Sequence, residues 1–103
     1  MQLIQILLPV FDNEGCRFER SRFDAVRARL IERFGGLTAF VQSPAQGLWK
    51  DVQTGATAHD DMILVEVMVE VFERDWWAAY RTELEALFRQ DEVVVRAIGC
   101  ERV

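Results

Sequence analysis

The stretch MILVEVMVEVF, residues 62–72, has the most regular alternation in the chain and is the starting point for predicting the fold. Its odd positions, from Ile63 to Val71, are all apolar and mostly β-branched. Its even positions include both apolar residues, such as Leu64 and Met68, and the acidic residues Glu66 and Glu70. Alternation with a period of two is typical of a strand. We therefore predict a strand with one face in the core and a mixed opposite face.

Downstream of this strand, the pattern changes to helical spacing. We predict a helix from about residue 74 to residue 88, because its apolar side chains recur every three or four positions. The predicted core-facing stripe consists of Trp77, Tyr80, Leu84, Leu87 and Phe88. The following segment EVVVRAIGCERV, residues 92–103, is rich in β-branched residues and predicts the last strand.

Upstream, the chain shows the same succession of strand and helix. Residues 2–10 predict a strand that buries Ile4, Ile6, Leu8 and Val10 and turns the alternate side chains to the other face. A helix should follow, because apolar residues are spaced helically between residues 23 and 34. Ser21 and Asp24 resemble a capping pair at its start, and Gly35 with Gly36 predicts a left-handed stop at its end.

The glycine-rich stretch FGGLTAFVQSPAQGLWKD, residues 34–51, could be a phosphate-binding loop or a connection between elements. Phosphate-binding glycines lie between a strand and the start of a helix, whereas this glycine pair follows a helix. We therefore predict a helix cap, a strand at residues 37–42, and a turn or edge-strand break at residues 43–47. Trp49 and its neighbours should continue an edge strand or form a short hairpin arm. Residues 54–61 should form a polar loop.

The order β-α-β-β-α-β predicts an α+β fold, the ferredoxin-like βαββαβ sandwich, as a single domain over residues 1–103. Two helices should cover one face of a four-stranded antiparallel sheet, and an extra short edge strand is an open alternative. In this topology Cys16 and Cys100 lie at opposite ends of the sheet, too far apart for a disulfide.

Length and charge limit the function classes. A chain of 103 residues with net charge −5 is a single globular domain without the basic field that nucleic-acid binding requires. Two glutamates on the third strand also argue against an RNA-binding sheet. No apolar run approaches the roughly 20 residues of a membrane span. We therefore expect a cytoplasmic protein with reduced cysteines and no nucleic-acid or membrane partner.

The sheet face that the helices leave uncovered is the predicted interaction surface. An apolar patch of this kind usually binds another molecule, and we expect it to join two copies as a homodimer. A small-molecule ligand is a further open possibility. The predicted ligand or interface residues are Leu3, Gln5, Leu7, Trp49, Leu64 and Met68.

Four side chains are candidates for proton chemistry: His59, Glu66, Glu70 and Arg96. Imidazole beside Asp60 and Asp61 can move protons or bind metal, but adjacent ligands rarely converge on one ion, so we predict a solvated turn and no metal site. Glu66 and Glu70 would lie roughly 13 Å apart on a strand, too far for a carboxylate dyad. Arg96 could partner either glutamate, in catalysis or in an interfacial salt bridge. No cofactor is predicted.

Five segments carry a family resemblance: QILLPVFDNEG, ERFGGLTAF, SPAQGLWKD, DDMILVEVMV and WWAAYRTELEALFRQDEVVVRA. Together they resemble a small, poorly characterised bacterial family of about 100-residue proteins with a ferredoxin-like fold of the dimeric α+β barrel type. The resemblance extends over nearly the whole chain. It implies a fold and a bacterial cytoplasmic context but no reaction, so it assigns no catalytic residue.

Two functional hypotheses lead, and a third, a subunit that pairs with an unrelated partner, is left open. The first is a small homodimeric protein that binds a small molecule or a protein partner. The second is a cofactor-independent enzyme of the dimeric-barrel type, similar to a monooxygenase or an isomerase, with the four candidates above acting in a cavity.

Overall fold

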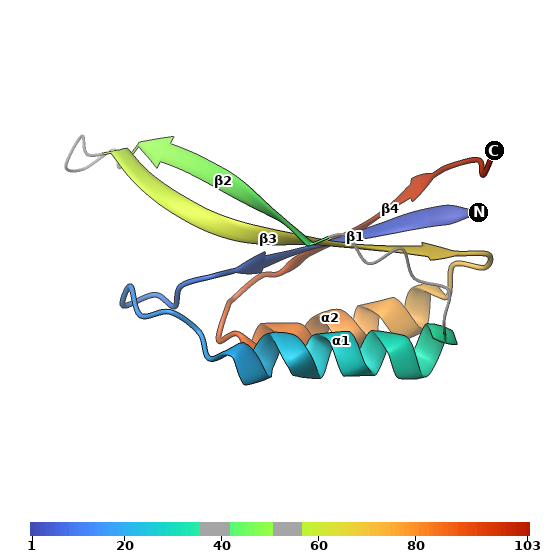
Figure 1. Ribbon diagram of the computed structural model, residues 1–103, viewed down its shortest axis with the longest axis horizontal. Coiled ribbons are helices and arrows are strands. Elements are labelled where there is room, and N and C mark those ends of the chain that lie inside the picture. The colour runs from blue at the N-terminus through green and yellow to red at the C-terminus, as the bar shows by residue number, and fades with distance from the viewer. Residues whose placement is uncertain (36–41, 51–56) are drawn as a thin grey trace.

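The computed structural model describes residues 1–35, 42–50 and 57–103, and for 42–50 and 57–61 it describes the backbone (Figure 1). The predicted order of strands and helices is confirmed. The elements are β1 (Gln2–Pro9), α1 (Arg20–Phe34), β2 (Gln42–Lys50), β3 (Thr57–Val69), α2 (Arg74–Leu87) and β4 (Val94–Gly99).

The four strands form one antiparallel sheet in the order β2-β3-β1-β4. Each helix therefore connects two strands that have a third strand between them. Both helices lie on the same side of the sheet in Figure 1, so the molecule has a helical layer and a sheet layer. This is the α+β, ferredoxin-like arrangement that the order of elements predicted.

The core lies between the two layers, where the alternation predicted it. Ile4, Ile6 and Leu8 of β1 have no exposed surface. Ile4 pairs with Val67 and Ile6 with Val65, so the buried rows of the two central strands coincide. The helices complete the core with Val26 and Leu30 of α1 and with Trp77, Tyr80 and Leu84 of α2; Phe88 follows α2. The predicted stripes on both helices are confirmed.

The end of β3 differs from the prediction. The strand ends at Val69, which pairs with Gln2 at the start of β1. Beyond that point β1 offers no partner, and the chain bends toward α2. Glu70 is exposed and Val71 is 71% exposed, so the prediction that Val71 belongs to the buried face is wrong. Glu66 and Glu70 consequently do not share one strand face. The last strand is also shorter than predicted, since β4 stops at Gly99.

Two further predictions, for residues 43–47 and for residues 59–61, are wrong. Residues 43–47, predicted as a turn or break, lie inside β2, where Pro44 pairs with Ile63. Proline is tolerated there because β2 is at the edge of the sheet and needs no second partner. His59, Asp60 and Asp61 belong to β3 and not to a loop. The predicted strand at 37–42 and the predicted loop at 54–56 lie outside the described residues, apart from Gln42 in β2.

For α1, the predicted C-terminal end agrees with the structure and the predicted N-terminal cap does not. The Ser21–Asp24 capping pair is wrong, because α1 begins at Arg20 after Glu19 and has no side-chain cap. Gly35 does end α1, with φ 66° and its amide donating to the carbonyl of Ile31. The cysteines are free, as expected, and Cys100 lies beside Met1 at the far end of β1 from Cys16.

Candidate functional site

The open face, meaning the sheet surface turned away from the helices, is formed by alternate residues of β1, β3 and β4. The strand register arranges them in three rows that cross the sheet. The polar row is Glu66, Gln5 and Arg96, and the two apolar rows beside it are Met68, Leu3 and Ile98 on one side and Leu64, Leu7 and Val94 on the other. Seven of these nine residues were predicted from the sequence, six on β1 and β3 together with Arg96 on β4.

The polar row is joined by hydrogen bonds. Arg96 Nε donates to Gln5 Oε1 over 2.6 Å, and Gln5 Nε2 donates to Glu66 Oε2 over 3.1 Å. The amide of Gln5 thus accepts from the cation and donates to the anion, which orients it between them. The row therefore has a direction across the sheet, with its negative end on β3 and its positive end on β4.

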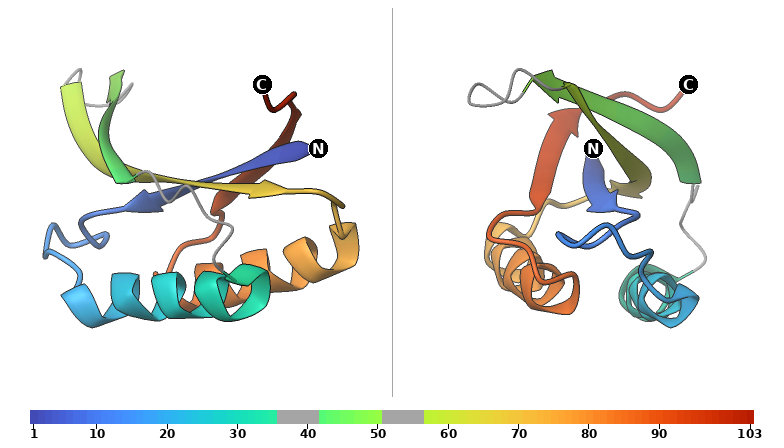
Figure 2. Two further views of the ribbon diagram at one scale, coloured as in Figure 1. Left: turned by 45° about the vertical axis from the view of Figure 1, so that its right-hand side comes forward. Right: turned by 90° about the vertical axis from the view of Figure 1, so that its left-hand side faces the viewer.

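The apolar rows leave hydrophobic surface accessible. Val94 is 42% exposed and Ile98 is 43% exposed, while Leu3, Leu7, Leu64 and Met68 are half-buried. Figure 2 shows that both helices lie on the other side of the sheet, and that β4 and the paired ends of β2 and β3 rise away from the helices. The open face is therefore a broad apolar surface crossed by a charged line, which is typical of an interaction site.

The predicted proton-transfer candidates do not assemble into one group. Glu66 and Arg96 are brought together through Gln5. Glu70 lies beyond the end of β3. The backbone of His59 pairs with Leu48, and the seven positions that separate it from Glu66 along the strand correspond to roughly 23 Å. The side chain of His59 and that of the predicted interface residue Trp49 are outside the described part of the structure.

Val94 and Ile98 were missed by the sequence prediction of the surface. The signal was present, because both residues are two positions from Arg96 and a strand turns such residues to one face. They add exposed aliphatic surface at the positive end of the polar row. The arrangement is suited to recognition of a surface with complementary rows, since its charges are held at a fixed spacing by hydrogen bonds.

Comparisons with known proteins bear on the fold. No protein-family model matches the chain, and no curated protein matches it. Solved structures do match. A phage SAM lyase in complex with S-methyl-5'-thioadenosine has a TM-score of 0.63 and 14% identity, covering 94% of this chain and 79% of that chain. A phage SAM lyase in the apo state has a TM-score of 0.56 and 15% identity, covering 99% and 91%.

A third matching structure is the periplasmic divalent cation tolerance protein CutA from Archaeoglobus fulgidus. Its TM-score is 0.54 at 19% identity, and the match covers 100% of this chain and 87% of that chain. The likeness shows the fold. At these identities it supports a small α+β protein of the ferredoxin-like type, and the resemblance to a particular bacterial family stays a prediction.

Among the described residues, no helix combines the length and the apolar character needed to cross a bilayer.

Proposed function

We propose that this protein acts as a homodimeric binding module whose two copies pack their open faces against each other. The observation that supports this most directly is the direction of the polar row, from Glu66 on β3 to Arg96 on β4, between two apolar rows. A surface with both signs of charge at opposite ends of one line is complementary to a rotated copy of itself.

The charges select one orientation of the two copies. A two-fold axis parallel to β1 and passing beside Gln5 turns the second sheet over and exchanges its β3 and β4 sides. Glu66 of each copy then faces Arg96 of the other, across sheets about 10 Å apart. A two-fold axis perpendicular to the strands would instead oppose Glu66 to Glu66 and Arg96 to Arg96. Like charges in a desolvated interface are costly, so the first arrangement is favoured.

The apolar rows would contribute most of the affinity. In the favoured orientation, Leu3 faces Leu3 and Met68 faces Ile98 of the second copy. In the other apolar row, Leu64 likewise faces Val94 of the second copy. Burial of these half-exposed side chains contributes on the order of 1 kcal/mol for each one. The charged pairs mainly set the register, because much of their attraction is offset by lost hydration.

The residues used in this dimer include the main candidates for catalysis. Glu66 and Arg96 are engaged in the polar row, while Glu70 and the backbone of His59 lie apart from it. Their arrangement favours a binding function over the enzyme hypothesis. A cytoplasmic location is part of the proposal and is supported by two free cysteines, one of them exposed.

A charge exchange across the polar row tests the proposal. Arg96→Glu should weaken the dimer by about tenfold or more, because each Glu66 would then face a glutamate. The double variant Glu66→Arg with Arg96→Glu should restore dimerisation, since the reversed pairs are again complementary. Arg102→Glu makes the same charge change at an exposed residue near the C-terminus and serves as the control.

Sedimentation velocity over a concentration series measures the dissociation constant of each variant. Circular dichroism checks that the variants remain folded. A monomeric wild type, or equal dissociation constants for Arg96→Glu and Arg102→Glu, would contradict an interface at the open face. A double variant as weak as Arg96→Glu would contradict the proposed axis.

A further inference from the structure

A cavity of about 440 Å³ lies on the helical side of the sheet, between α1 and strands β1 and β3. We refer to it as the α1 pocket. Leu8, Val26 and Val65 form its apolar floor and are buried, and Phe23 and Ile63 flank it. Its volume is within the range of pockets that hold small organic ligands. Leu8 and Val65 point away from the open face, so the pocket is separate from the proposed dimer interface.

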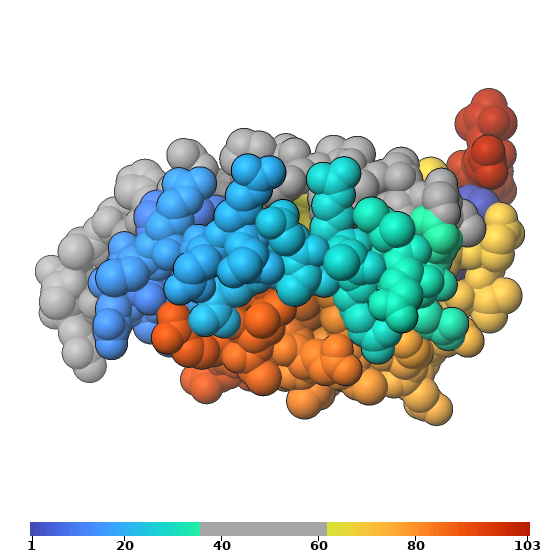
Figure 3. All heavy atoms as spheres, turned by 60° about the horizontal axis from the view of Figure 1, so that its bottom comes forward, coloured from blue at the N-terminus to red at the C-terminus, as the bar shows by residue number. Residues whose placement is uncertain are grey.

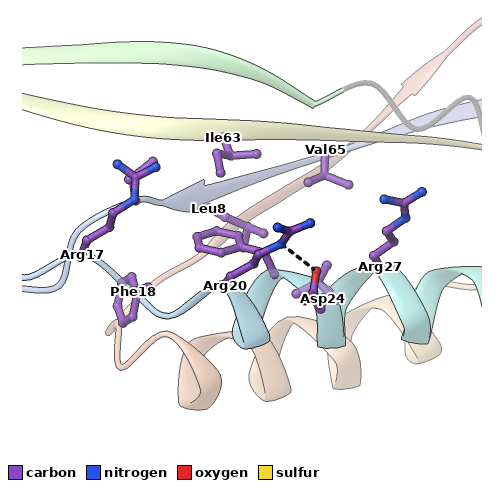
Figure 4. A pocket seen from close by; sticks show the side chains of 11 residues that line it. Leu8, Arg17, Phe18, Arg20, Asp24, Arg27, Ile63 and Val65 are labelled. Carbon is purple, nitrogen blue, oxygen red and sulfur yellow. Dashed lines mark ion pairs between the residues drawn. The ribbon is translucent and has the colours of Figure 1, made fainter.

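Arginines are the main charged side chains among the residues described at the rim of the α1 pocket. Arg17 precedes α1, and Arg20 and Arg27 lie on the helix, whereas Asp24 is the acidic residue among those lining the pocket. Figure 4 shows the side chains of Arg17 and Arg27 extending toward β3. Among the described residues that line the pocket, arginines therefore outnumber acidic residues, on a protein whose net charge is −5.

The ion pair on the rim is weak enough to be exchanged for a ligand. Arg20 Nε lies 3.9 Å from Asp24 Oδ1, and the two side chains are 93% and 63% exposed. An exposed pair at this distance contributes little, because water screens it and both side chains retain other rotamers. Arg20 can therefore turn to an incoming anion at small cost.

We propose that the α1 pocket binds a small organic carboxylate with an apolar body. The body would lie against the aliphatic and aromatic floor, and the carboxylate would be bound at the rim by Arg17 and Arg20. Guanidinium groups form paired, charge-assisted hydrogen bonds with carboxylates, which gives both affinity and orientation. A neutral ligand would form no charge-assisted hydrogen bonds with Arg17 and Arg20. An inorganic anion would make no apolar contacts with the floor of the pocket.

Isothermal titration calorimetry with three probes tests the site in the intact protein. Naphthoate has both the apolar body and the carboxylate, naphthamide is its neutral isostere, and inorganic phosphate has charge alone. We expect naphthoate to bind at least tenfold more tightly than either of the others. Equal affinity for naphthoate and naphthamide would overturn the role of charge, and tighter binding of phosphate would overturn the role of the floor.

Two sets of variants locate the binding. The double variant Arg17→Gln with Arg20→Gln should weaken naphthoate binding by about tenfold to a hundredfold, since it removes charge-assisted hydrogen bonds. Arg102→Gln removes one charge elsewhere and should leave the affinity unchanged. Ile63→Trp should block the cavity and reduce the binding of both naphthyl probes.

The folded state of each variant is checked by circular dichroism, and chemical-shift mapping on the wild type gives an independent readout. Shifts centred on Val26 and Val65 are expected. Shifts centred on the open face, or unchanged affinity in the double arginine variant, would overturn the proposal. Because sedimentation velocity measures dimerisation separately, failure of this site is distinguishable from failure of the proposed dimer.

Discussion

Tyr80 on α2 is a buried side chain whose polar group has no evident role in the core. The residue is 4% exposed and its ring packs near those of Trp76 and Trp77. Among the described residues, its hydroxyl has no hydrogen-bond partner. Burial raises the pKa of Tyr80 well above its ordinary value of 10.0, the nearby carboxylate of Glu83 raises it further, and Arg29 opposes the shift. The neutral phenol is therefore strongly favoured in the folded protein.

This raised pKa predicts a specific response to alkaline conditions. The unfolded chain loses the phenolic proton near pH 10, whereas the folded protein retains it, so stability should fall as the pH rises above that value. Tyr80 is the single tyrosine, so tyrosinate absorbance reports on this residue alone. We expect ionisation to appear only with the loss of helical circular dichroism. Ionisation near pH 10 in a protein that is still folded would contradict a buried phenol.

Tyr80→Phe is the control for this measurement. The variant keeps the ring and removes the group that titrates. Its free energy of unfolding, measured in urea, should decline less between neutral and alkaline pH than that of the wild type. If the free energies of unfolding of Tyr80→Phe and of the wild type decline equally, groups other than Tyr80 cause the alkaline loss of stability.

At the scale of elements, the end of α1 depends on one glycine. Gly35 has φ 66° and ψ −150°, a backbone conformation that is essentially restricted to glycine. A Cβ built there would meet nothing within 4 Å, so crowding is not what excludes other residues. The requirement comes from the backbone itself, which turns sharply after Phe34 while the Gly35 amide still bonds to the last turn of the helix.

Gly35→Ala should therefore destabilise the protein by about 1–3 kcal/mol, the usual cost of a side chain in such a conformation. Gly99→Ala is a matched control, because Gly99 also has open space around it but its φ is not positive. Urea unfolding of both variants measures the difference. Equal free energies of unfolding would show that the backbone at Gly35 relaxes on substitution.

At the scale of the whole molecule, the two layers separate two kinds of surface. The helices α1 and α2 lie on one side of the molecule, as the space-filling view in Figure 3 shows, and α1 contributes to the rim of the α1 pocket. The opposite side carries the polar row and its two apolar rows. The proposed dimer interface and the proposed ligand site therefore lie on opposite sides of the sheet and use different residues.

Met68→Arg tests the open face as an assembly surface. Met68 lies in an apolar row opposite Leu3, on the face away from the core. The substitution should shift the protein toward the monomer, because a buried guanidinium without a partner in the interface is costly. Helix content should be retained. Sedimentation velocity and circular dichroism measure the two quantities, and an unchanged mass would show that this face is not the interface.

Several features of the fold could be predicted because they depend on local patterns. The alternation in β1 and β3, and the stripes on α1 and α2, identified the buried face of each element correctly. Boundaries were less predictable. Pro44 and Gly47 indicated a break, yet an edge position permits them inside β2, and the edge is a property of the sheet as a whole. Val71 continued the alternation but lacked a partner strand.

Within β1, β3 up to Val69, α1 and α2, the sequence by itself determined which side chains face the core, because that depends on the two-residue period of a strand and the helical repeat. The tertiary structure alone decided which side chains meet. Gln5 lies between Glu66 and Arg96, which are 61 and 91 positions away along the chain. Their contact depends on strand order and register, which are set by how the layers pack and by no pattern within a single element.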